Sequence, residues 1–299
     1  MIYWFRIQDL IVFAVIIPTY NAELRFAELL YSLQKQTLKP TQIAVIDSES
    51  TDQTREIAKK QNCKIITISL TDFDHGTARN LPLPDIKTEF VIYFTQDVLC
   101  ADGRTIEKLL KPMQCDPNIA VCYGRQIPNP DADPLEMFAR EFNYPMYSML
   151  KTKADLPKLG INTFFCSNSC AAYRRSIFEK LGGFENGVGT NEDMLFAAKA
   201  IMAGYGVYYA ADAKVFHSHN YTLQSLWRRY FNIGLFFVQH SWLSKAAPVG
   251  GKGRQMVSRG MRHFWESRQW KYIVLFLIQS IVKALAFKCG QLYGLISCR

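Results

Sequence analysis

Polar side chains follow three short apolar runs in the N-terminal part of the chain, each at the point where the run ends. The polar segments are Pro18–Asn21, Asp47–Asp52 and Thr95–Asp97, and the runs before them are Phe13–Ile17, Ile43–Ile46 and Phe90–Phe94. Short and continuously apolar runs are typical of strands buried in a parallel sheet. Ligands of open parallel sheets bind outside the carboxyl ends of the strands. The sequence therefore predicts one crevice that is lined by carboxylates, amides and hydroxyls.

The chemistry of this crevice follows from what the sequence contains and lacks. Neither the glycine fingerprint of dinucleotide-binding proteins nor the P-loop occurs in it. A nucleotide would therefore be held by carboxylates, amides and a metal ion rather than by a glycine-rich phosphate loop. Further along the chain, His217 and His219 flank one serine, and a spacing of two on an extended strand places both side chains on one face.

The alternation of apolar runs with helical patterns predicts an α/β fold. After the first strand, Phe26, Leu29 and Leu33 lie on one face of a helix. A further strand is expected at Lys64–Ile68. Strand, helix and strand in this order require right-handed crossovers and predict a mostly parallel sheet with helices on both faces. Later elements are expected as helices at 105–113 and 192–203 and as strands at 120–123, 169–173 and 207–210.

Length and composition exclude several classes of protein. The 299 residues are enough for one large or two small domains, and the apolar share of 49% excludes a disordered or low-complexity chain. The eight cysteines are scattered without a C-x-x-C pair, which argues against a zinc ribbon and is typical of a reducing compartment. Arg6 and Asp9 interrupt the apolar N-terminal run, so we expect no secretory leader and a cytoplasmic protein.

Positive charge is concentrated at the C-terminal end. Residues 221–299 contain 12 lysines and arginines and one acidic residue, whereas residues 1–220 are close to neutral. A basic region rich in tryptophan, phenylalanine and leucine is typical of a membrane-surface element. Nucleic-acid binding is the competing interpretation, but the region holds no recognisable nucleic-acid motif. Its longest apolar run, Tyr272–Phe287, is shorter than the ~20 residues of a spanning helix, so we expect it to lie on the inner face of the cell membrane.

The ordered set of motifs resembles glycosyltransferase family 2. The segments that carry the resemblance are Val15–Asn21, Val45–Thr54, Gly182–Phe184 and Asn191–Asp193. Phe73–Asn80, followed by Thr95–Asp97, is similar to the bacterial rhamnosyltransferase branch of this family. The resemblance covers about residues 13–240. It implies a GT-A domain over residues 1–240, in which residues 13–125 bind the nucleotide sugar and residues 126–240 the acceptor, followed by a basic amphipathic extension over residues 241–299.

The resemblance implies how the donor is held. Asp47 would accept a hydrogen bond from N3 of a pyrimidine base, although an aspartate in this place can also cap a helix. Arg79 would supply charge beside the phosphates, with a surface ion pair as the alternative. Asp74 and His75 would shape the donor pocket or form a structural turn. The complete donor set is Pro18, Thr19, Tyr20, Asn21, Asp47, Ser50, Asp74, His75, Arg79 and Gln96.

The same resemblance implies a divalent metal ion, Mg²⁺ or Mn²⁺, at Asp97. A cation on oxygen ligands would neutralise the charge of a pyrophosphate leaving group. The family usually carries two aspartates that flank one residue, and here Thr95 stands in the first of those places. His217 or His219 would complete the metal site, or the two histidines would simply be partly exposed.

The Glu192-Asp193 pair matches the catalytic motif of the family. Asp193 would act as the base that takes the proton of the acceptor hydroxyl, with Glu192 in support. Both acids also lie in the first turn of an expected helix, where the helix dipole favours them. Arg228 and Arg229 would bind a phosphate of the donor or of a lipid-linked acceptor, or would face anionic lipid.

These expectations combine into one predicted activity, an inverting transfer of rhamnose from dTDP-rhamnose to a lipid-linked glycan in cell-surface (O-antigen) polysaccharide synthesis. Two alternatives remain open: the same fold with a UDP-hexose donor, and a non-catalytic scaffold that binds nucleotide sugars. The presence of both Asp97 and Asp193 argues against the scaffold, since a degenerate member would be free to lose them. No nucleic-acid partner is expected.

Overall fold

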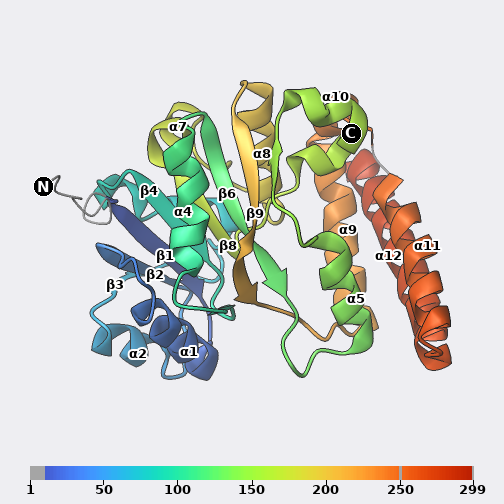
Figure 1. Cartoon of the computed structure of the whole chain (residues 1–299), viewed down its shortest axis with the longest axis horizontal. Coiled ribbons are helices and arrows are strands. Elements are labelled where there is room, and N and C mark those ends of the chain that lie inside the picture. Colours follow the sequence, from blue (N-terminus) through green and yellow to red (C-terminus); the bar gives the residue numbers. More distant parts are fainter. Residues whose placement is uncertain (1–10, 249–250, 298–299) are drawn as a thin grey trace, which may run out of the picture.

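A nine-stranded β-sheet organises the chain in the computed structural model, which describes residues 11–248 and 251–297 (Figure 1). Across the sheet the strands are β3 (Lys64–Thr67), β2 (Gln42–Asp47), β1 (Phe13–Thr19), β4 (Phe90–Phe94), β8 (Cys170–Arg174), β6 (Ile119–Ile127), β9 (Gly206–Phe216) and β5 (Leu99–Cys100). A short strand, β7 (Met149–Lys151), also pairs with β9. Arg6 and Asp9, on which the expectation about a leader rests, lie outside the described residues.

The predicted parallel pairing holds for the first four strands along the chain. β1 pairs in parallel with both β2 and β4, and β2 pairs in parallel with β3. The rest of the sheet is mixed, because β8 runs antiparallel to both of its neighbours, β4 and β6, while β6 and β9 are parallel. The start of β8 therefore meets the carboxyl ends of β4 and β6 at one edge of the sheet. The α/β fold is confirmed, with a sheet that is wholly parallel from β3 to β4 and mixed beyond β4.

Helices cover both faces of the sheet, as predicted. Alternate residues of a strand point to opposite faces, and the two sets belong to two separate cores. One core lies under α1 (Glu23–Gln34), α2 (Thr54–Lys60) and α4 (Thr105–Cys115). The other core lies under α3 (His75–Asn80), α7 (Arg175–Lys180), α8 (Glu192–Met202), α9 (Leu223–Gln239) and α10 (Ser241–Ala246). Short helical turns lie at Leu83–Asp85, Lys153–Asp155, Leu156–Leu159 (α6) and Gly160–Phe164.

The C-terminal helices form a separate layer beside the sheet. α11 (Gly251–Glu266) and α12 (Trp270–Ser297) lie against α5 (Pro134–Asn143) and α9 (Figure 1). Their contact with α5 is a small apolar cluster of Leu135, Phe138, Phe264 and Phe276. The preceding α10 contributes Leu243 to the core that lies under α3, α7 and α8. A domain division at residue 240 stays a prediction, since that core also includes Leu243 and Ala247.

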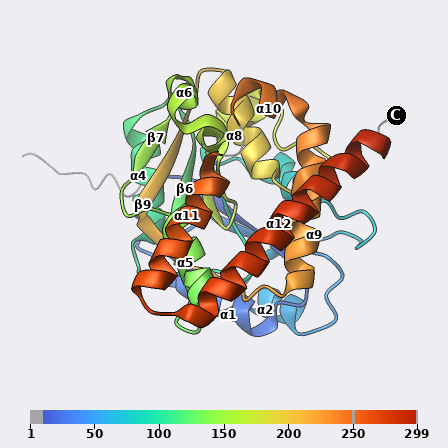
Figure 2. The same ribbon diagram turned by 90° about the vertical axis from the view of Figure 1, so that its right-hand side faces the viewer.

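α12 crosses α9 with the two backbones in direct contact (Figure 2). A Cβ atom added at Gly234 of α9 would overlap the carbonyl oxygen of Phe287, and one added at Gly290 of α12 would overlap the carbonyl oxygen of Phe231. Only glycine fits in these two places, because small residues let helix backbones approach closely. This glycine crossing, defined by Gly234 and Gly290, attaches α12 to the body of the protein.

We expect Gly290→Ala to separate α12 from α9 and to lower the free energy of unfolding by about 1–3 kcal/mol, the usual range for overpacking. The matched control is Gly253→Ala in α11, where no heavy atom lies within 4 Å of the added methyl group. That variant should be neutral or more stable by up to about 1 kcal/mol, because alanine is the better helix former. Urea denaturation of both variants measures the difference, and equal stabilities would contradict the packing described here.

The length of α12 corrects one sequence-based expectation. The helix continues past Phe287 to Ser297, and its 28 residues, with a mean hydropathy of 1.8 in the most apolar window, make it the one described helix long and apolar enough to cross a membrane. The prediction that this segment is too short to span is therefore wrong. It failed because the apolar run was counted only to Phe287, whereas the helix continues over Lys288 and two glycines.

Candidate active site

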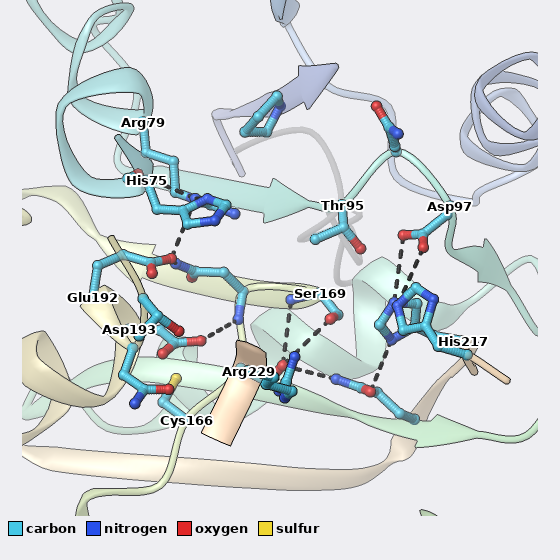
Figure 3. Close-up of a pocket in the computed structure, with 18 of the residues that line it drawn as sticks. His75, Arg79, Thr95, Asp97, Cys166, Ser169, Glu192, Asp193, His217 and Arg229 are labelled. Carbon is cyan, nitrogen blue, oxygen red and sulfur yellow. Dashed lines mark hydrogen bonds and ion pairs between the residues drawn. The ribbon is translucent and has the colours of Figure 1, made fainter. Parts of the chain in front are cut away.

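A cavity of about 570 Å³ opens at the edge of the sheet where β1 and β4 end and β8 begins (Figure 3). Most of the residues that the sequence pointed to meet there, although they come from six separate segments of the chain. The predicted residues that line the cavity are Pro18, Thr19, Tyr20, His75, Arg79, Gln96, Asp97, Glu192, Asp193, His217, His219 and Arg229. The expectation of one crevice at the carboxyl ends of the strands is confirmed.

Three predicted donor residues, Asn21, Asp47 and Ser50, do not line the cavity. The hydroxyl of Ser50 accepts a hydrogen bond from the backbone N–H of Asn21 at 3.0 Å, which ties together the loops after β1 and β2. Asp47 is fully buried, with Oδ2 accepting from the Ser50 backbone N–H at 3.2 Å and lying 3.7 Å from Nε of Arg55. Its Oδ1 has no hydrogen-bond partner among the described residues. A role of Asp47 in base binding stays a prediction.

Two further predicted residues also lie outside the cavity lining. Asp74 caps the start of α3, where its Oδ1 accepts from the backbone N–H groups of Gly76 at 3.0 Å and Thr77 at 2.8 Å. Burial alone would raise the pKa of Asp74, but these bonds hold it below the ordinary value. The geometry is that of a structural turn, which presents the next residues of α3 to the cavity. Arg228 does not line the cavity, unlike its neighbour Arg229.

Glu192 forms a buried ion pair in the first turn of α8. Its Oε1 lies 3.3 Å from Nη1 of Arg79 and accepts a hydrogen bond from Nδ2 of Asn168 at 2.9 Å. Burial by itself would raise the pKa of Glu192, but the charge of Arg79 and the neighbouring His75 hold it below the ordinary value. Glu192 is therefore a fixed negative charge rather than a proton acceptor.

The environment of Asp193 differs from that of the adjacent Glu192. Its carboxylate accepts hydrogen bonds from the backbone N–H groups of Asn168 at 3.0 Å and of Met194 at 2.7 Å. Burial, together with the negative charge of Glu192, raises the pKa of Asp193 to about 7. A carboxylate whose pKa lies near neutrality is suited to accept a proton from a substrate hydroxyl. The two neighbouring acids thus have opposite pKa shifts and different chemical uses.

Asp97 and two histidines converge on the other side of the cavity (Figure 3). Nε2 of His217 lies 3.4 Å from Oδ1 of Asp97, and Nε2 of His219 lies 3.4 Å from Oδ2. Burial and the neighbouring His217 ring lower the pKa of His219 to about 4, so this imidazole is neutral and its nitrogen can bind a cation. Burial would raise the pKa of Asp97, but the two histidines hold it well below its usual range. The three groups are close enough together to hold one metal ion.

Gln126 orients the His217 ring. Its Oε1 lies 2.9 Å from Nδ1 of His217 and also accepts from the guanidinium of Arg140, which fixes the oxygen on this side of the amide. This contact holds the ring with Nε2 directed at Asp97. Such a contact is common behind histidines that bind metals.

Gln126 and Asn168 are functional residues that the sequence did not single out. β6 extends to Ile127, so the rule about strand ends would have included Gln126 if the strand had been predicted at its full length. Asn168 precedes β8, and only the antiparallel direction of that strand brings its start to the cavity. No local motif marks that reversal.

The cavity thus has two chemically distinct sides. One side offers a carboxylate and two imidazoles, which suit a divalent cation and a developing negative charge. The other offers Asp193, a base with a pKa near neutrality, beside the fixed charge of Glu192. This arrangement is suited to group transfer, in which one side stabilises a leaving anion and the other takes the proton of an attacking hydroxyl.

Comparison with solved structures agrees with this architecture. A mannosyltransferase from Pyrobaculum calidifontis, PcManGT, solved in complex with GDP-Man and Mn²⁺, superposes with a TM-score of 0.60 at 19% identity, over 91% of this chain and 86% of its own. TarS residues 1–349 from S. aureus superpose with a TM-score of 0.56 at 22% identity, over 87% of this chain and 73% of that one. At these identities the likeness concerns the fold.

Comparison of the amino-acid sequence identifies the family as well as the fold. Residues 14–182 match Glycosyl transferase family 2, and residues 100–297 match Glycosyl transferase family group 2. The O-antigen chain rhamnosyltransferase WbaN of Salmonella anatum is 41% identical over 93% of this chain and 89% of its own length. The O-antigen chain rhamnosyltransferase RfbN of Salmonella typhimurium is 41% identical over 93% and 88%. The chain therefore belongs to glycosyl transferase family 2 and is a glycosyltransferase with a GT-A-like fold.

Proposed function

We propose that this enzyme transfers rhamnose from dTDP-rhamnose, with inversion, to a glycan acceptor of a cell-surface polysaccharide. The observation that carries the proposal is the pairing, in one cavity, of Asp193 with the Asp97–His217–His219 cluster. The choice of sugar is supported by the 41% identity to two O-antigen chain rhamnosyltransferases over 93% of the chain.

In the proposed reaction the acceptor hydroxyl attacks the anomeric carbon of the donor sugar. The hydroxyl proton passes to the carboxylate of Asp193 as the new C–O bond forms. The bond between the sugar and the nucleoside diphosphate breaks, and its electron pair leaves with the diphosphate. Glu192 holds Arg79 in place and keeps the pKa of Asp193 high enough for proton transfer. One carboxylate base is sufficient for a single displacement, which inverts the anomeric centre.

The donor would lie between Asp193 and the cluster of Asp97, His217 and His219. Arg79 lines the cavity, where its guanidinium would supply positive charge beside the phosphates, although its unpartnered Nε is itself buried. The unpartnered Oδ1 of Asp47 is an acceptor of the kind that the N3–H of a thymine or uracil base requires. Reaching it would require the loop after β2 to move, because Asp47 is fully buried.

The proposed cofactor is Mn²⁺, held by Asp97, His217 and His219. Imidazole nitrogen suits first-row transition metals better than it suits Mg²⁺, whereas the carboxylate suits either ion. When bound, the cation would neutralise negative charge on the diphosphate. This mixed donor set therefore favours Mn²⁺ within the predicted pair of metals.

The donor is tested by measuring the release of nucleoside diphosphate from dTDP-rhamnose, UDP-glucose, UDP-galactose and GDP-mannose, each with Mn²⁺ or with EDTA. We expect turnover of dTDP-rhamnose and at least about tenfold less with the other donors, equivalent to about 1.4 kcal/mol of discrimination. Turnover of a UDP-hexose instead would keep the family and overturn the choice of rhamnose. Binding without turnover, even after a lipid-linked acceptor extract is added, would support the scaffold alternative.

We also propose that the C-terminal layer rests on the cytoplasmic face of an anionic membrane. α11 and α12 lie side by side on one face of the molecule (Figure 2). Apolar side chains of α12 are exposed there: Val274, Ile281, Leu285, Leu292, Leu295 and Ile296. Exposed basic side chains adjoin them: Arg254, Arg259, Arg262, Arg268, Lys271 and Lys288. Because the glycine crossing attaches α12 to α9, a spanning α12 would draw α9 into the bilayer, so a helix that lies along the surface fits better.

Flotation with phosphatidylglycerol vesicles tests this placement. We expect binding that weakens between 0.1 M and 1 M salt, because each basic residue at the surface contributes about 1 kcal/mol and is screened by salt. Alkaline carbonate should release the protein from membranes. Resistance to carbonate would instead indicate a helix that is inserted across the bilayer.

A further inference from the structure

A second cavity, of about 240 Å³, adjoins the catalytic cavity. It lies among α5, α9, α11 and α12, and we call it the side chamber. The two cavities share wall residues, namely Arg140, Tyr144, Phe165, His219, Tyr221 and Arg229. A ligand in the side chamber would therefore lie directly beside the metal-binding cluster and within reach of the catalytic cavity.

α12 presents two half-buried polar side chains, Gln279 and Lys283, to the side chamber. Lys283 is the only charged residue between Lys271 and Lys288, in a helix that is otherwise apolar over this stretch. Lys283 and Gln279, one helical turn before it, both line the side chamber. Nζ of Lys283 lies 5.8 Å from the centre of the Tyr230 ring of α9. A lone lysine in this place costs desolvation energy unless it has an anionic partner.

Two cations of the side chamber lack carboxylate partners. Within residues 11–248 and 251–297, neither Lys283 nor Arg229 lies within ion-pair distance of an acid. Arg229 donates to the hydroxyl of Tyr221 at 3.3 Å and makes no other side-chain hydrogen bond there. A guanidinium and an ammonium that face one cavity without counter-charges are typical of an oxyanion site.

Two acidic side chains, Glu136 and Asp133, also line the side chamber. Oε1 of Glu136 lies 2.6 Å from Nε of Arg140, on the next turn of α5. Oδ1 of Asp133 caps α5 by accepting from the backbone N–H of Glu136 at 2.8 Å. The lining therefore holds three cations, Arg140, Arg229 and Lys283, against two carboxylates, and of the cations only Arg140 has an ion-pair partner among the described residues.

We propose that the side chamber binds the phosphate or diphosphate group that joins the acceptor glycan to a lipid, with Lys283 and Arg229 as its ligands. The inference rests on the proposed function and adds the place where the linking phosphate of the acceptor binds and the residues that bind it. The exposed apolar face of the same helix would place the lipid tail in the membrane, while the side chamber holds the head group. The glycan beyond the phosphate then enters the catalytic cavity through the shared wall.

Binding of decyl diphosphate tests the site directly. The full-length enzyme is first saturated with Mn²⁺ and the nucleoside diphosphate identified in the donor assay, so that the donor site is filled. Titration calorimetry then compares decyl diphosphate, decyl glucoside and inorganic diphosphate. We expect decyl diphosphate to bind most tightly, because it has both the anion and the alkyl chain.

The decisive variants lie on one helix. Lys283→Gln should weaken the binding of decyl diphosphate by about tenfold, the effect of losing one charge-assisted hydrogen bond. Lys283→Arg should keep most of the affinity. The matched control is Lys288→Gln, since Lys288 is exposed and lies outside the side chamber. Donor hydrolysis without acceptor should be unchanged in all three variants, which also shows that they fold.

Each other outcome overturns the proposal. Equal affinity of Lys283→Gln and the unaltered enzyme for decyl diphosphate would exclude Lys283 as a ligand. Equal losses in Lys283→Gln and Lys288→Gln would indicate a general effect of surface charge. Inorganic diphosphate binding as tightly as decyl diphosphate would make the site one for free phosphate. Failure of the unaltered enzyme to turn over any donor, even with a lipid-linked acceptor extract added, would refute the proposed function instead, so the two failures are distinguishable.

Discussion

Asp193→Asn should lower kcat for sugar transfer by about 10²–10⁴-fold, the usual contribution of a general base. Asparagine keeps the shape of the side chain but cannot take the proton of the acceptor hydroxyl. Donor affinity should change little: the backbone N–H groups of Asn168 and Met194 donate to different oxygens of Asp193, so only one of them loses its acceptor, and the predicted donor residues are not altered. Steady-state kinetics with saturating donor and acceptor measure the effect.

The matched control for this variant is Asp212→Asn. Asp212 lies on β9 but is exposed and does not line the cavity. Its replacement should leave kcat within about twofold, the range expected for a surface substitution. Equal losses in both variants, or full activity of Asp193→Asn, would contradict the assignment of the base.

The same base gives a pH dependence with a defined sign. Asp193 acts only when ionised, and its pKa is raised to about 7 by burial and by Glu192. We therefore expect kcat/KM to fall about tenfold per pH unit below that value and to level off above it. Glu192→Gln removes the nearby negative charge and leaves Arg79 unpaired, so the midpoint should move to lower pH. An unchanged midpoint of the pH profile would show that Glu192 does not raise the pKa of Asp193.

Removal of the metal site should have an effect of similar size. We expect EDTA, Asp97→Asn and His217→Ala each to lower kcat by about 10²-fold or more, because the charge on the diphosphate would lose its counter-ion. Added Mn²⁺ should restore the chelated enzyme but not the two variants. His240→Ala is the control, since His240 lies near Glu185 and outside the cavity. Full activity in EDTA would refute metal dependence.

Replacing Gln126 tests whether this residue orients the metal-binding ring of His217 or takes a direct part in the chemistry. Gln126→Leu should weaken Mn²⁺ binding by about 10–100-fold, as is usual when a partner behind a metal-binding histidine is lost. With saturating Mn²⁺, kcat should return close to that of the unaltered enzyme, because Gln126 does not itself bind the ion. A titration of activity against Mn²⁺ distinguishes the two roles: a lower plateau at every concentration would assign Gln126 a direct part in the chemistry.

The position of the site was predictable because it depends on the direction of parallel strands. Three apolar runs end in polar residues, and the ends of β1, β2 and β4 meet at one edge of the sheet in register. The spacing of His217 and His219 also held, because both rings reach Asp97. These features depend on local periodicity, which one sequence contains.

Other features depend on contacts between distant segments, which local periodicity does not contain. Nothing in the loop after β2 distinguishes Ser48, which lines the cavity, from Asp47 and Ser50, which do not. Asn168 enters the site only because β8 reverses direction. The side chamber depends on α12, whose packing on α9 is specified by glycines far apart in the chain.

The glycine crossing also fixes the distance between the catalytic cavity and the apolar face of α12. α9 carries Arg229 at the rim of the catalytic cavity, and α12 carries the apolar residues proposed to contact lipid. Because the two backbones touch at Gly234 and Gly290, neither helix can slide or tilt without the other. On the proposed membrane placement, the height of Asp193 above the bilayer would therefore be a constant of the fold. An acceptor anchored in that bilayer presents only one position along its glycan at this height, so the enzyme would select its acceptor by length as well as by sugar.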